Sequence, residues 1–385
     1  MIFYLTLFIF FIALYKWAEL RESKWLLFFA ILIPALFEGL RDDFVGEDML
    51  GYGGDWFDYM DENDSVMTMF DLAQTPEYAY HLLIYICKNI FPDIHLFMTA
   101  CALIKMTAVT LFAYRMREQL SSILFLFCYY CFFYVTGFSI MRQGVAVAIC
   151  IYSLSYFINH DIKRFLLVVA VSYFFHNSAI LMLLLIPLYY MRNFRYKYIL
   201  ILGSSFFIYT SVEVLFELVL MSPLFKSEMA DLYIDSGVVS AKTNLLISTV
   251  FLGYGAYLFF SKGIKTKGME GENENEIEEQ ETETEEDNET RKEDTNTYFL
   301  IVTSALTLLF LLLSSYIEVA FRMSYYMFIV SAIIVLMEIY KSERFRGIII
   351  MGFVFLFFLH FYIGCKHGLA GALEYSSAIL GISFV

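Results

Sequence analysis

Residues 141–152 read Met-Arg-Gln-Gly-Val-Ala-Val-Ala-Ile-Cys-Ile-Tyr, an apolar run with a single charge near its start. Even on a lenient insertion scale, an arginine in the middle of a membrane helix costs about 2.5–3.5 kcal/mol. A positive charge retained there, with no acid beside it, indicates a place where a negative group binds. Arg142 is therefore the first candidate for a functional residue.

Apolar runs recur along the whole chain of 385 residues, of which 59% are hydrophobic and only 17% charged. Each run has about 20 residues, enough for a helix to cross a hydrocarbon core of about 30 Å. Residues 1–15 are apolar from Met1 and lack a basic segment or a cleavage site, so we expect this first span to be retained. The composition predicts an all-α polytopic membrane protein.

One segment differs from the rest in composition. Residues 269–297 hold fourteen acids against Arg291 and Lys292, which is a charge of −12 out of −14 for the chain. Such a stretch cannot bury a core, so we expect a disordered cytoplasmic loop that acts as a solvated spacer rather than a binding tail. The chain then divides into a membrane domain, the acidic loop and a continued membrane domain, at 1–267, 268–297 and 298–385.

Basic residues gather in six short clusters, and such clusters stay on the cytoplasmic side of a membrane. Placing all six inside predicts an external N-terminus and external loops at 41–76 and 217–242. It also predicts about ten full spans, at 1–15, 25–40, 95–114, 121–137, 140–158, 198–216, 243–261, 298–316, 322–340 and 347–363.

Two further apolar segments do not fit as simple crossings. Residues 77–91 would reverse the basic clusters if they spanned, so they are interpreted as a re-entrant or interfacial helix on the outer side. Residues 165–190 have basic clusters at both ends and a polar break at Phe-His-Asn-Ser, 175–178. This pattern predicts a broken helical hairpin whose tip lies within the membrane or near its outer face.

The threading places nine of the twelve arginines on the cytoplasmic side and leaves Arg41, Arg142 and Arg322 at outer ends of spans. With His176 at the hairpin tip, they are predicted to line one outward-facing cavity. Each of these four residues also has an alternative interpretation. Arginines at helix ends often reach to lipid headgroups. Arg41 has Asp42 and Asp43 as local partners, Glu318 lies four residues before Arg322, and His176 fits a buried core histidine as well.

The first external loop, 41–76, carries ten acids interleaved with aromatic residues and glycines, including Tyr52 and Trp56. Aromatic rings stack on sugar C–H faces and carboxylates accept hydrogen bonds from hydroxyls, so this mixture suits a carbohydrate. A merely solvated loop is the alternative, and a calcium loop is disfavoured because the 12-residue EF-hand pattern is incomplete. Glu77, at the start of the re-entrant helix, is placed to meet an arginine or to act as a base.

These motifs resemble the EpsG/Wzy-type polysaccharide polymerases. Arg-Asp-Asp-Phe-Val-Gly-Glu-Asp, from Arg41, is similar to that family's Arg…Gly-Thr-Asp-Tyr segment, with Glu47 at the position where threonine is usual. Met-Arg-Gln-Gly-Val-Ala, Phe-Phe-His-Asn-Ser-Ala and Phe-Arg-Met-Ser-Tyr-Tyr resemble its later motifs, in the same order along the chain, at 141–146, 174–179 and 321–326.

The resemblance implies a GT-C-like membrane glycosyltransferase of the bacterial inner membrane, acting on its periplasmic or outer face. It would join undecaprenyl-diphosphate-linked oligosaccharide repeat units into an O-antigen of lipopolysaccharide, a capsule or an exopolysaccharide. Arginines would stabilise the diphosphate leaving group, and a base would activate the acceptor hydroxyl. The expected catalytic residues are His176, Asp48 and Glu77, in that order, and the expected substrate-binding residues are Arg142, Arg322, Arg41, Gln143, Tyr52, Trp56 and Tyr325.

No metal or cofactor is expected, and no nucleic acid. The expected partners are the lipid bilayer, the lipid-linked oligosaccharide and a chain-length regulator protein. Three other readings stay open: an O-antigen ligase, a transporter or flippase of lipid-linked sugars, and a membrane acyltransferase. A flippase would favour internal repeats with cations spread through the span depth, whereas these cations gather at one end.

Overall fold

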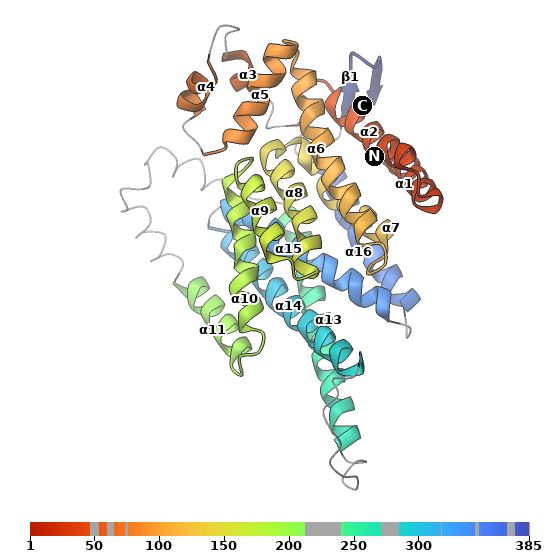
Figure 1. The fold of residues 1–385 in the computed structure, drawn as a ribbon, viewed down its shortest axis with the longest axis vertical. Helices are drawn as coiled ribbons and strands as arrows, with labels where there is room; N and C mark the ends of the chain where they lie inside the picture. Colours follow the sequence, from red (N-terminus) through yellow and green to blue (C-terminus); the bar gives the residue numbers. More distant parts are fainter. Residues whose placement is uncertain are drawn as a thin grey trace. The chain divides into compact units, whose positions relative to one another are not determined.

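The structure is a computed structural model that describes residues 1–46, 54–59, 65–73, 76–211, 240–270, 285–316, 318–342, 346–367 and 374–384. The chain divides into two units, Met1–Leu183 with Ile339–Val385, and Leu184–Glu338. Both units are built from helices, and a two-stranded hairpin ends the first (Figure 1). The prediction of an all-α polytopic membrane protein is confirmed at the level of the fold class.

In the first unit, long apolar helices alternate with shorter ones. The elements are α1 (Ile2–Arg21), α2 (Lys24–Gly39), α3 (Gly54–Tyr59), α4 (Val66–Ala73), α5 (Tyr78–Ile90), α6 (Ile94–Arg115), α7 (Ser122–Tyr129), the π-helical η2 (Tyr130–Tyr134), the 3-10 turn η3 (Thr136–Phe138), α8 (Met141–Ile158), α9 (Ile162–Tyr173), the 3-10 segment η4 (Asn177–Leu184), α16 (Arg346–Lys366), β1 (Tyr375–Ser377) and β2 (Ile382–Phe384).

The core of this unit is α6 with α8, which lie side by side in Figure 1. Helix α2 packs on α6 and α9 packs on α8. The α2–α6 contact is close because Gly39 has no side chain: a Cβ there would lie 2.4 Å from Thr99 Cα. Ser172 fixes α9 to α8 by donating its hydroxyl to the Ala146 carbonyl at 2.8 Å.

The second unit contains α10 (Leu185–Met191), α11 (Lys197–Thr210), α13 (Ser240–Glu270), α14 (Glu285–Leu313) and α15 (Glu318–Lys341), of which the last three residues belong to the first unit. Helices α13 and α14 pack closely, with Gly255 against Ile301. The hydroxyls of Thr303 and Ser331 lie 2.8 Å apart and join α14 to α15. These few polar contacts are set in an otherwise apolar interior.

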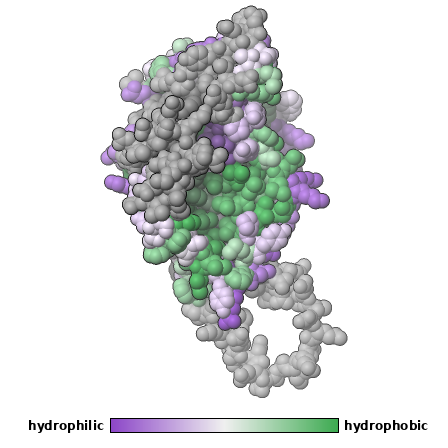
Figure 2. All heavy atoms as spheres, turned by 90° about the vertical axis from the view of Figure 1, so that its left-hand side faces the viewer, coloured by the Kyte–Doolittle hydropathy of each residue, from purple (hydrophilic) through white to green (hydrophobic). Residues whose placement is uncertain are grey.

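Within the described residues, seven helices are long and apolar enough to cross a membrane: α1, α6, α8, Lys242–Ser261 of α13, Thr295–Leu313 of α14, Val319–Lys341 of α15, and α16. Each coincides with one of the ten expected spans. Three of them, α1, Lys242–Ser261 of α13 and α16, carry several exposed large apolar side chains. Figure 2 shows hydrophobic residues gathered on one face. An apolar surface of this kind suits contact with lipid.

The other three expected spans are shorter helices. Helix α2 has 16 residues, and α11 has 14, followed by residues that lie outside the described ranges. In the segment 121–137 the α-helix ends at Tyr129 and continues as a π turn and a 3-10 turn. The count of ten full spans and the GT-C-like architecture therefore stay predictions.

Both predicted partial elements are short in the structure. Helix α5 has 13 residues, about 20 Å of helix, which is too little for a core of about 30 Å. Helix α9 ends at Tyr173, and a 3-10 segment starts at Asn177, so the break falls at the polar residues where it was predicted. The second half of that hairpin enters the other unit, so its return across the membrane stays a prediction.

The acidic stretch is helical at both of its described ends. Helix α13 continues to Glu270, and α14 starts at Glu285. Glutamate and lysine are good helix formers, so a charged sequence next to an apolar helix extends it readily. Residues 271–284 lie outside the described residues, as does most of the expected external segment 217–242, and disorder in the acidic loop stays a prediction.

Helix ends of the first unit gather as the threading predicts. On one side, the Phe3 ring stacks on Tyr375 with centroids 4.4 Å apart, and the Tyr375 hydroxyl donates to the Phe37 carbonyl at 2.7 Å. These contacts join the start of α1, the end of α2 and the C-terminal hairpin. At the opposite ends, the Ser122 hydroxyl donates to Glu19 at 3.0 Å. Which of the two sides faces the cytoplasm stays a prediction.

Candidate functional site

Three helix ends meet in the first unit and bring together the side chains that the sequence singled out. Glu77 is the N-cap residue of α5, Arg142 lies in the first turn of α8, and His176 lies in the break between α9 and η4. The backbone N–H of Ala79 donates to the Phe174 carbonyl at 2.9 Å, so the start of α5 is tied to the end of α9. Each helix end supplies one polar group to the same spot.

The carboxylate of Glu77 joins Arg142 and His176. Its Oε2 accepts from Arg142 NH1 at 2.6 Å, and its Oε1 lies 2.8 Å from His176 Nδ1. Glu77 is buried, with 2% of its surface exposed. The side chains of Arg142 and His176 keep 13% and 19% exposure, so both remain open to solvent. The structure therefore places three of the predicted site residues in one cluster, which we call the Glu77 cluster.

The charge of Glu77 is set by these neighbours. Burial on its own raises the pKa of the Glu77 carboxyl, but the His176 hydrogen bond and the Arg142 charge outweigh it and hold this pKa below its usual value. Glu77 is therefore ionised at neutral pH. A carboxylate with both oxygens engaged by cationic donors is a weak base, so its position suits orienting His176 and Arg142 rather than taking a proton itself.

The tautomer of His176 is assigned from its distance to Glu77. Nδ1 lies 2.8 Å from the Glu77 carboxylate, which only accepts hydrogen bonds, so we assign the ring hydrogen to Nδ1. In this neutral tautomer the lone pair lies on Nε2. His176 is thereby arranged as a base at Nε2. This pairing of histidine and carboxylate is common in sites that activate a hydroxyl.

A second histidine, His81, lies one turn into α5 and was not predicted. It is fully buried, and its surroundings include the charges of Glu77 and Arg142. Burial lowers the pKa of His81 to about 4, so its imidazole is neutral at pH 7. The i, i+4 spacing from Glu77 places the two residues on one face of the helix, and that spacing is the sequence signal that identifies it.

Arg41 belongs to a different, fully buried cluster. Its guanidinium donates to the carbonyls of Val45 at 2.9 Å, of Phe138 at 3.2 Å and of Glu38. It also lies 4.6 Å from the centroid of the Phe138 ring. Arg41 is fully buried, with 0% exposed, and its expected substrate-binding role stays a prediction. The carboxylate of Asp42, its expected local partner, accepts from the Ala378 N–H instead.

Next to Arg41 lies a buried ion pair that was also not predicted. Lys105 of α6 contacts the carboxylate of Glu38 of α2, with 2% and 1% of the two side chains exposed. Lys105 Nζ also donates to the Gly137 carbonyl at 3.1 Å. The sequence signal was available, because an acid and a base stand in neighbouring apolar runs and such charges are usually paired or functional.

The remaining candidates are placed less closely. Gln143 follows Arg142 in α8 and is buried. Arg322 is half-buried and Tyr325 buried, both in the first turns of α15. They belong to the second unit, so their approach to the Glu77 cluster stays a prediction. Asp48 and Tyr52 lie outside the described residues, as does the Glu318 side chain. Trp56 lies in α3, and its side chain is also outside them.

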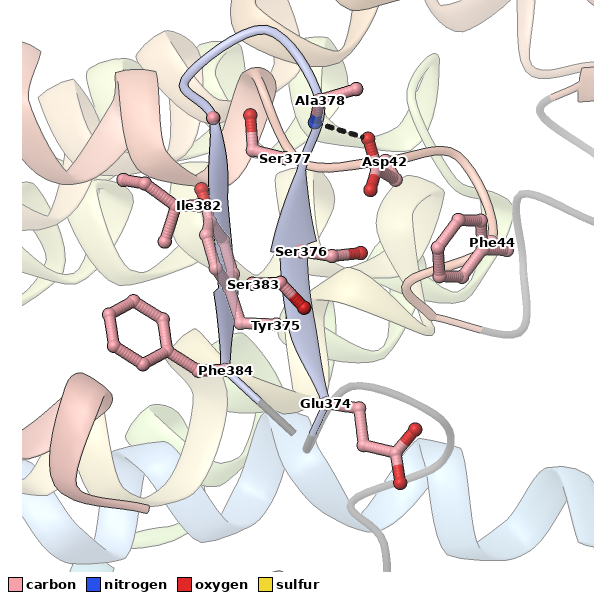
Figure 3. Close-up of a pocket in the computed structure, with 11 residues that line it drawn as sticks. Asp42, Phe44, Glu374, Tyr375, Ser376, Ser377, Ala378, Ile382, Ser383 and Phe384 are labelled. Atoms are coloured by element: carbon pink, nitrogen blue, oxygen red, sulfur yellow. Dashed lines mark hydrogen bonds between the residues drawn. The ribbon is translucent and has the colours of Figure 1, made fainter.

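A cleft of about 470 Å³ opens between the C-terminal hairpin and the turn after Arg41 (Figure 3). The Asp42 N–H donates to the Ser376 carbonyl at 2.9 Å, and this contact holds the hairpin in place. Ser376 pairs with Ser383 across the strands, which places both hydroxyls on one face of the hairpin. Phe44 and Glu374 stand beside that face with exposed side chains.

Among the described residues, no group of three or more histidine, cysteine, aspartate or glutamate side chains is arranged to hold a metal ion. Comparison with curated proteins and with solved structures finds no match to this chain. The sequence model of the EpsG family matches residues 24–377, nearly the whole chain. It thus includes the turn after α2, the Glu77 cluster and the first turns of α15. The chain belongs to the EpsG family, a family of Wzy-type polysaccharide polymerases.

Proposed function

We propose that this protein polymerises undecaprenyl-diphosphate-linked oligosaccharide repeat units at the outer face of the bacterial inner membrane. The observation that carries the proposal is the Glu77 cluster, which pairs a histidine arranged as a base with a partly exposed arginine. Glycosyl transfer from a lipid diphosphate needs both functions at one place. The product is a surface polysaccharide such as an O-antigen, a capsule or an exopolysaccharide.

In the proposed step, a hydroxyl of the acceptor unit attacks the anomeric carbon of the donor chain. His176 Nε2 takes the hydroxyl proton as the new glycosidic bond forms. The bond between the anomeric carbon and the diphosphate oxygen breaks, and its electron pair leaves with undecaprenyl diphosphate. Glu77 stabilises the imidazolium through Nδ1, so the carboxylate serves the base without exchanging the proton itself.

Arg142 is proposed to bind the diphosphate. It lies in the first turn of α8, an 18-residue helix, where the helix dipole favours an anion. The guanidinium adds a fixed positive charge and a fork of donors that matches phosphate oxygens. Arg322, with Tyr325 one turn further along α15, is proposed as a second substrate-binding cation.

The glycan part of the substrate is proposed to lie along the hairpin cleft. The exposed Phe44 ring offers a stacking surface, while Glu374 and Ser383 offer hydrogen-bonding groups for sugar hydroxyls. Arg41, beside the cleft residue Asp42, donates to the carbonyl of Phe138, which lies four residues before Arg142. Pockets of this size hold small ligands, which here corresponds to a short stretch of sugar units.

The decisive test replaces Arg142 with alanine and with lysine in the producing strain and examines the surface polysaccharide on a gel. Loss of the polymer ladder in both variants is expected, because lysine restores the charge but not the paired donors. Arg164→Ala is the matched control, since that side chain is 67% exposed beside Asp161. Normal ladders from both Arg142 variants would refute the proposed diphosphate clamp.

The pattern of accumulation separates polymerase from the other readings. A polymerase defect leaves single repeat units attached to their acceptor, whereas a ligase defect leaves free polymer that is not attached. A flippase defect leaves the lipid-linked unit on the cytoplasmic side. Sidedness is tested with Phe44→Cys and a membrane-impermeant maleimide, because all six native cysteines are buried. Labelling of intact cells or spheroplasts is expected.

A further inference from the structure

The turn that leads into Arg142 is held by two charged side chains, one from α6 and one from the turn after α2. It follows the π-helical η2 and the 3-10 turn η3, whose irregular backbone leaves carbonyls outside a helical ladder. The Gly137 carbonyl accepts from Lys105 and the Phe138 carbonyl from Arg41. Helix α8 begins three residues later, at Met141. The first turn of α8 is therefore fixed through these two carbonyls.

The Lys105–Glu38 pair is not explained by stability alone. Taking two charges into an apolar interior costs several kcal/mol each, and well-packed apolar substitutes for a buried ion pair are often at least as stable. A buried pair is better suited to specifying one geometry than to strengthening a fold. Here the geometry is specific, since Lys105 reaches past Glu38 to Gly137 with a hydrogen bond of 3.1 Å.

The space around Gly137 is arranged for this contact. A Cβ on Gly137 would lie 3.2 Å from Lys105 Nζ, and a Cβ on Gly144 would lie 3.4 Å from Gly137 Cα. The two glycines therefore let α8, the turn and the lysine come together. A movement of the turn relative to α6 would lengthen the Lys105 hydrogen bond and shift the start of α8, which carries Arg142.

We propose that Lys105, held by Glu38, is a positioning residue that sets the place of Arg142 through the Gly137 carbonyl. Lys105 does not touch substrate; it determines where the Arg142 guanidinium meets Glu77 and the diphosphate. This inference rests on the proposed function of Arg142. It adds that a residue of α6, buried between helices, controls the affinity for the lipid diphosphate.

Two double variants separate the hydrogen bond from the charge. Glu38→Gln with Lys105→Gln removes both charges and keeps an N–H donor near Gly137. Glu38→Gln with Lys105→Met removes both charges and the donor, with a side chain that fills the same space. Neither leaves one charge of the Lys105–Glu38 pair without the other, and both remove the Glu38 carboxylate beside Arg41 in the same way, so the two variants are expected to accumulate in the membrane at the same level. The ion pair of Lys16 and Glu19 in α1, replaced by methionine and glutamine, is the matched control.

The measurement is polymer formation by membranes supplied with lipid-linked repeat units at increasing concentration. For the methionine variant we expect the apparent KM for the donor to rise about 10- to 100-fold, the usual effect of losing a hydrogen bond from a charged group. The glutamine variant is expected to stay within about threefold of wild type. A purely structural role would change the amount of protein rather than this difference in KM.

Equal KM values for the two variants would overturn the proposal. So would loss of both proteins from the membrane, because the pair would then be required for folding. Arg142→Lys is measured in parallel. If Arg142→Lys abolishes polymer and the methionine variant behaves as wild type, only the positioning role fails. If Arg142→Lys itself behaves as wild type, the failure lies in the proposed function.

Discussion

Gly46 lies directly against the carbonyl group of Phe138: a Cβ built on Gly46 would be 2.5 Å from the Phe138 oxygen. Gly46 also has a φ of 102°, a backbone conformation that residues with a side chain rarely adopt. The same Phe138 carbonyl accepts from Arg41. The turn after α2 and the turn before α8 are thus held together at one peptide group.

Gly46→Ala is expected to destabilise the protein by about 1–3 kcal/mol, from the strained φ together with the contact to Phe138. Thermal unfolding of the detergent-purified protein measures this as a lower Tm. Gly352→Ala in α16 is the matched control, since nothing lies within 4 Å of a Cβ there, and alanine in a helix adds about 0.5–1 kcal/mol of stability. A Tm for Gly46→Ala equal to that of Gly352→Ala would contradict the contact.

His176→Ala is expected to lower kcat for polymerisation by about 100- to 10,000-fold, the usual contribution of a positioned base. The KM for the lipid-linked donor should change little, because the histidine acts on the acceptor hydroxyl. Both constants are measured in membranes over a range of donor concentrations. His95→Ala is the control, since that histidine pairs with Asp93 at the start of α6. A large rise in KM with unchanged kcat would argue against the proposed base.

Glu77 gives the stability of the protein a defined dependence on pH. Its folded-state pKa lies below the ordinary value of 4.5, so the carboxylate stabilises the folded state above about pH 4.5. That contribution is lost as the pH falls through the lower, folded-state pKa.

Glu77→Gln is therefore expected to lower the Tm at pH 7, by the loss of about 1.5–3 kcal/mol, and to flatten the fall in Tm below pH 4.5. The measurement is a series of thermal unfolding curves between about pH 3 and 8, a range that extends below the reference pKa values of carboxylates. Parallel curves for wild type and Glu77→Gln at all pH values would contradict the charged contacts to Arg142 and His176.

Phe44→Ala is expected to shorten the polysaccharide without abolishing it, because a stacking ring contributes to holding the glycan and not to bond cleavage. An aromatic contact of this kind contributes about 0.5–1.5 kcal/mol, enough to shift the distribution of ladder lengths. Phe355→Ala is the control, an equally exposed ring on the lipid-facing side of α16 at 63% exposure against 58% for Phe44. Identical ladders for the two variants would remove Phe44 from the proposed glycan site.

Arg142, His176 and Glu77 could be predicted because each is a polar group beside an apolar run, where the free-energy cost of burial is large enough to require a reason. The break at His176 followed from polar residues that separate two short apolar halves. The sequence predicted one cavity for Arg142 and His176 and an arginine near Glu77. The contacts that join all three could not be predicted, because they depend on tertiary contacts such as that between Ala79 and Phe174. A single sequence does not contain the distances between α5, α8 and α9.

The Lys105–Glu38 pair could have been predicted in the same way, because each residue is a charge within an apolar run. It was not identified, because the two residues were assigned only to membrane spans. The C-terminal hairpin was harder to foresee: its strands have three residues each and are held by contacts to α2 and Phe3. The role of Arg41 depends on where Phe138 and Val45 place their carbonyls. Local sequence indicates that a cation is present, and only the fold shows which acceptors surround it.

The close contact of Gly39 with Thr99 determines where α2 ends along α6. Thr99 is five residues from the start of α6 at Ile94, so α2 stops about 8 Å short of that end of α6 at 1.5 Å per residue. The turn with Arg41, which follows α2, therefore begins short of that end. On the proposed sidedness, a diphosphate attached to a lipid tail would be bound within the headgroup layer, without leaving the bilayer.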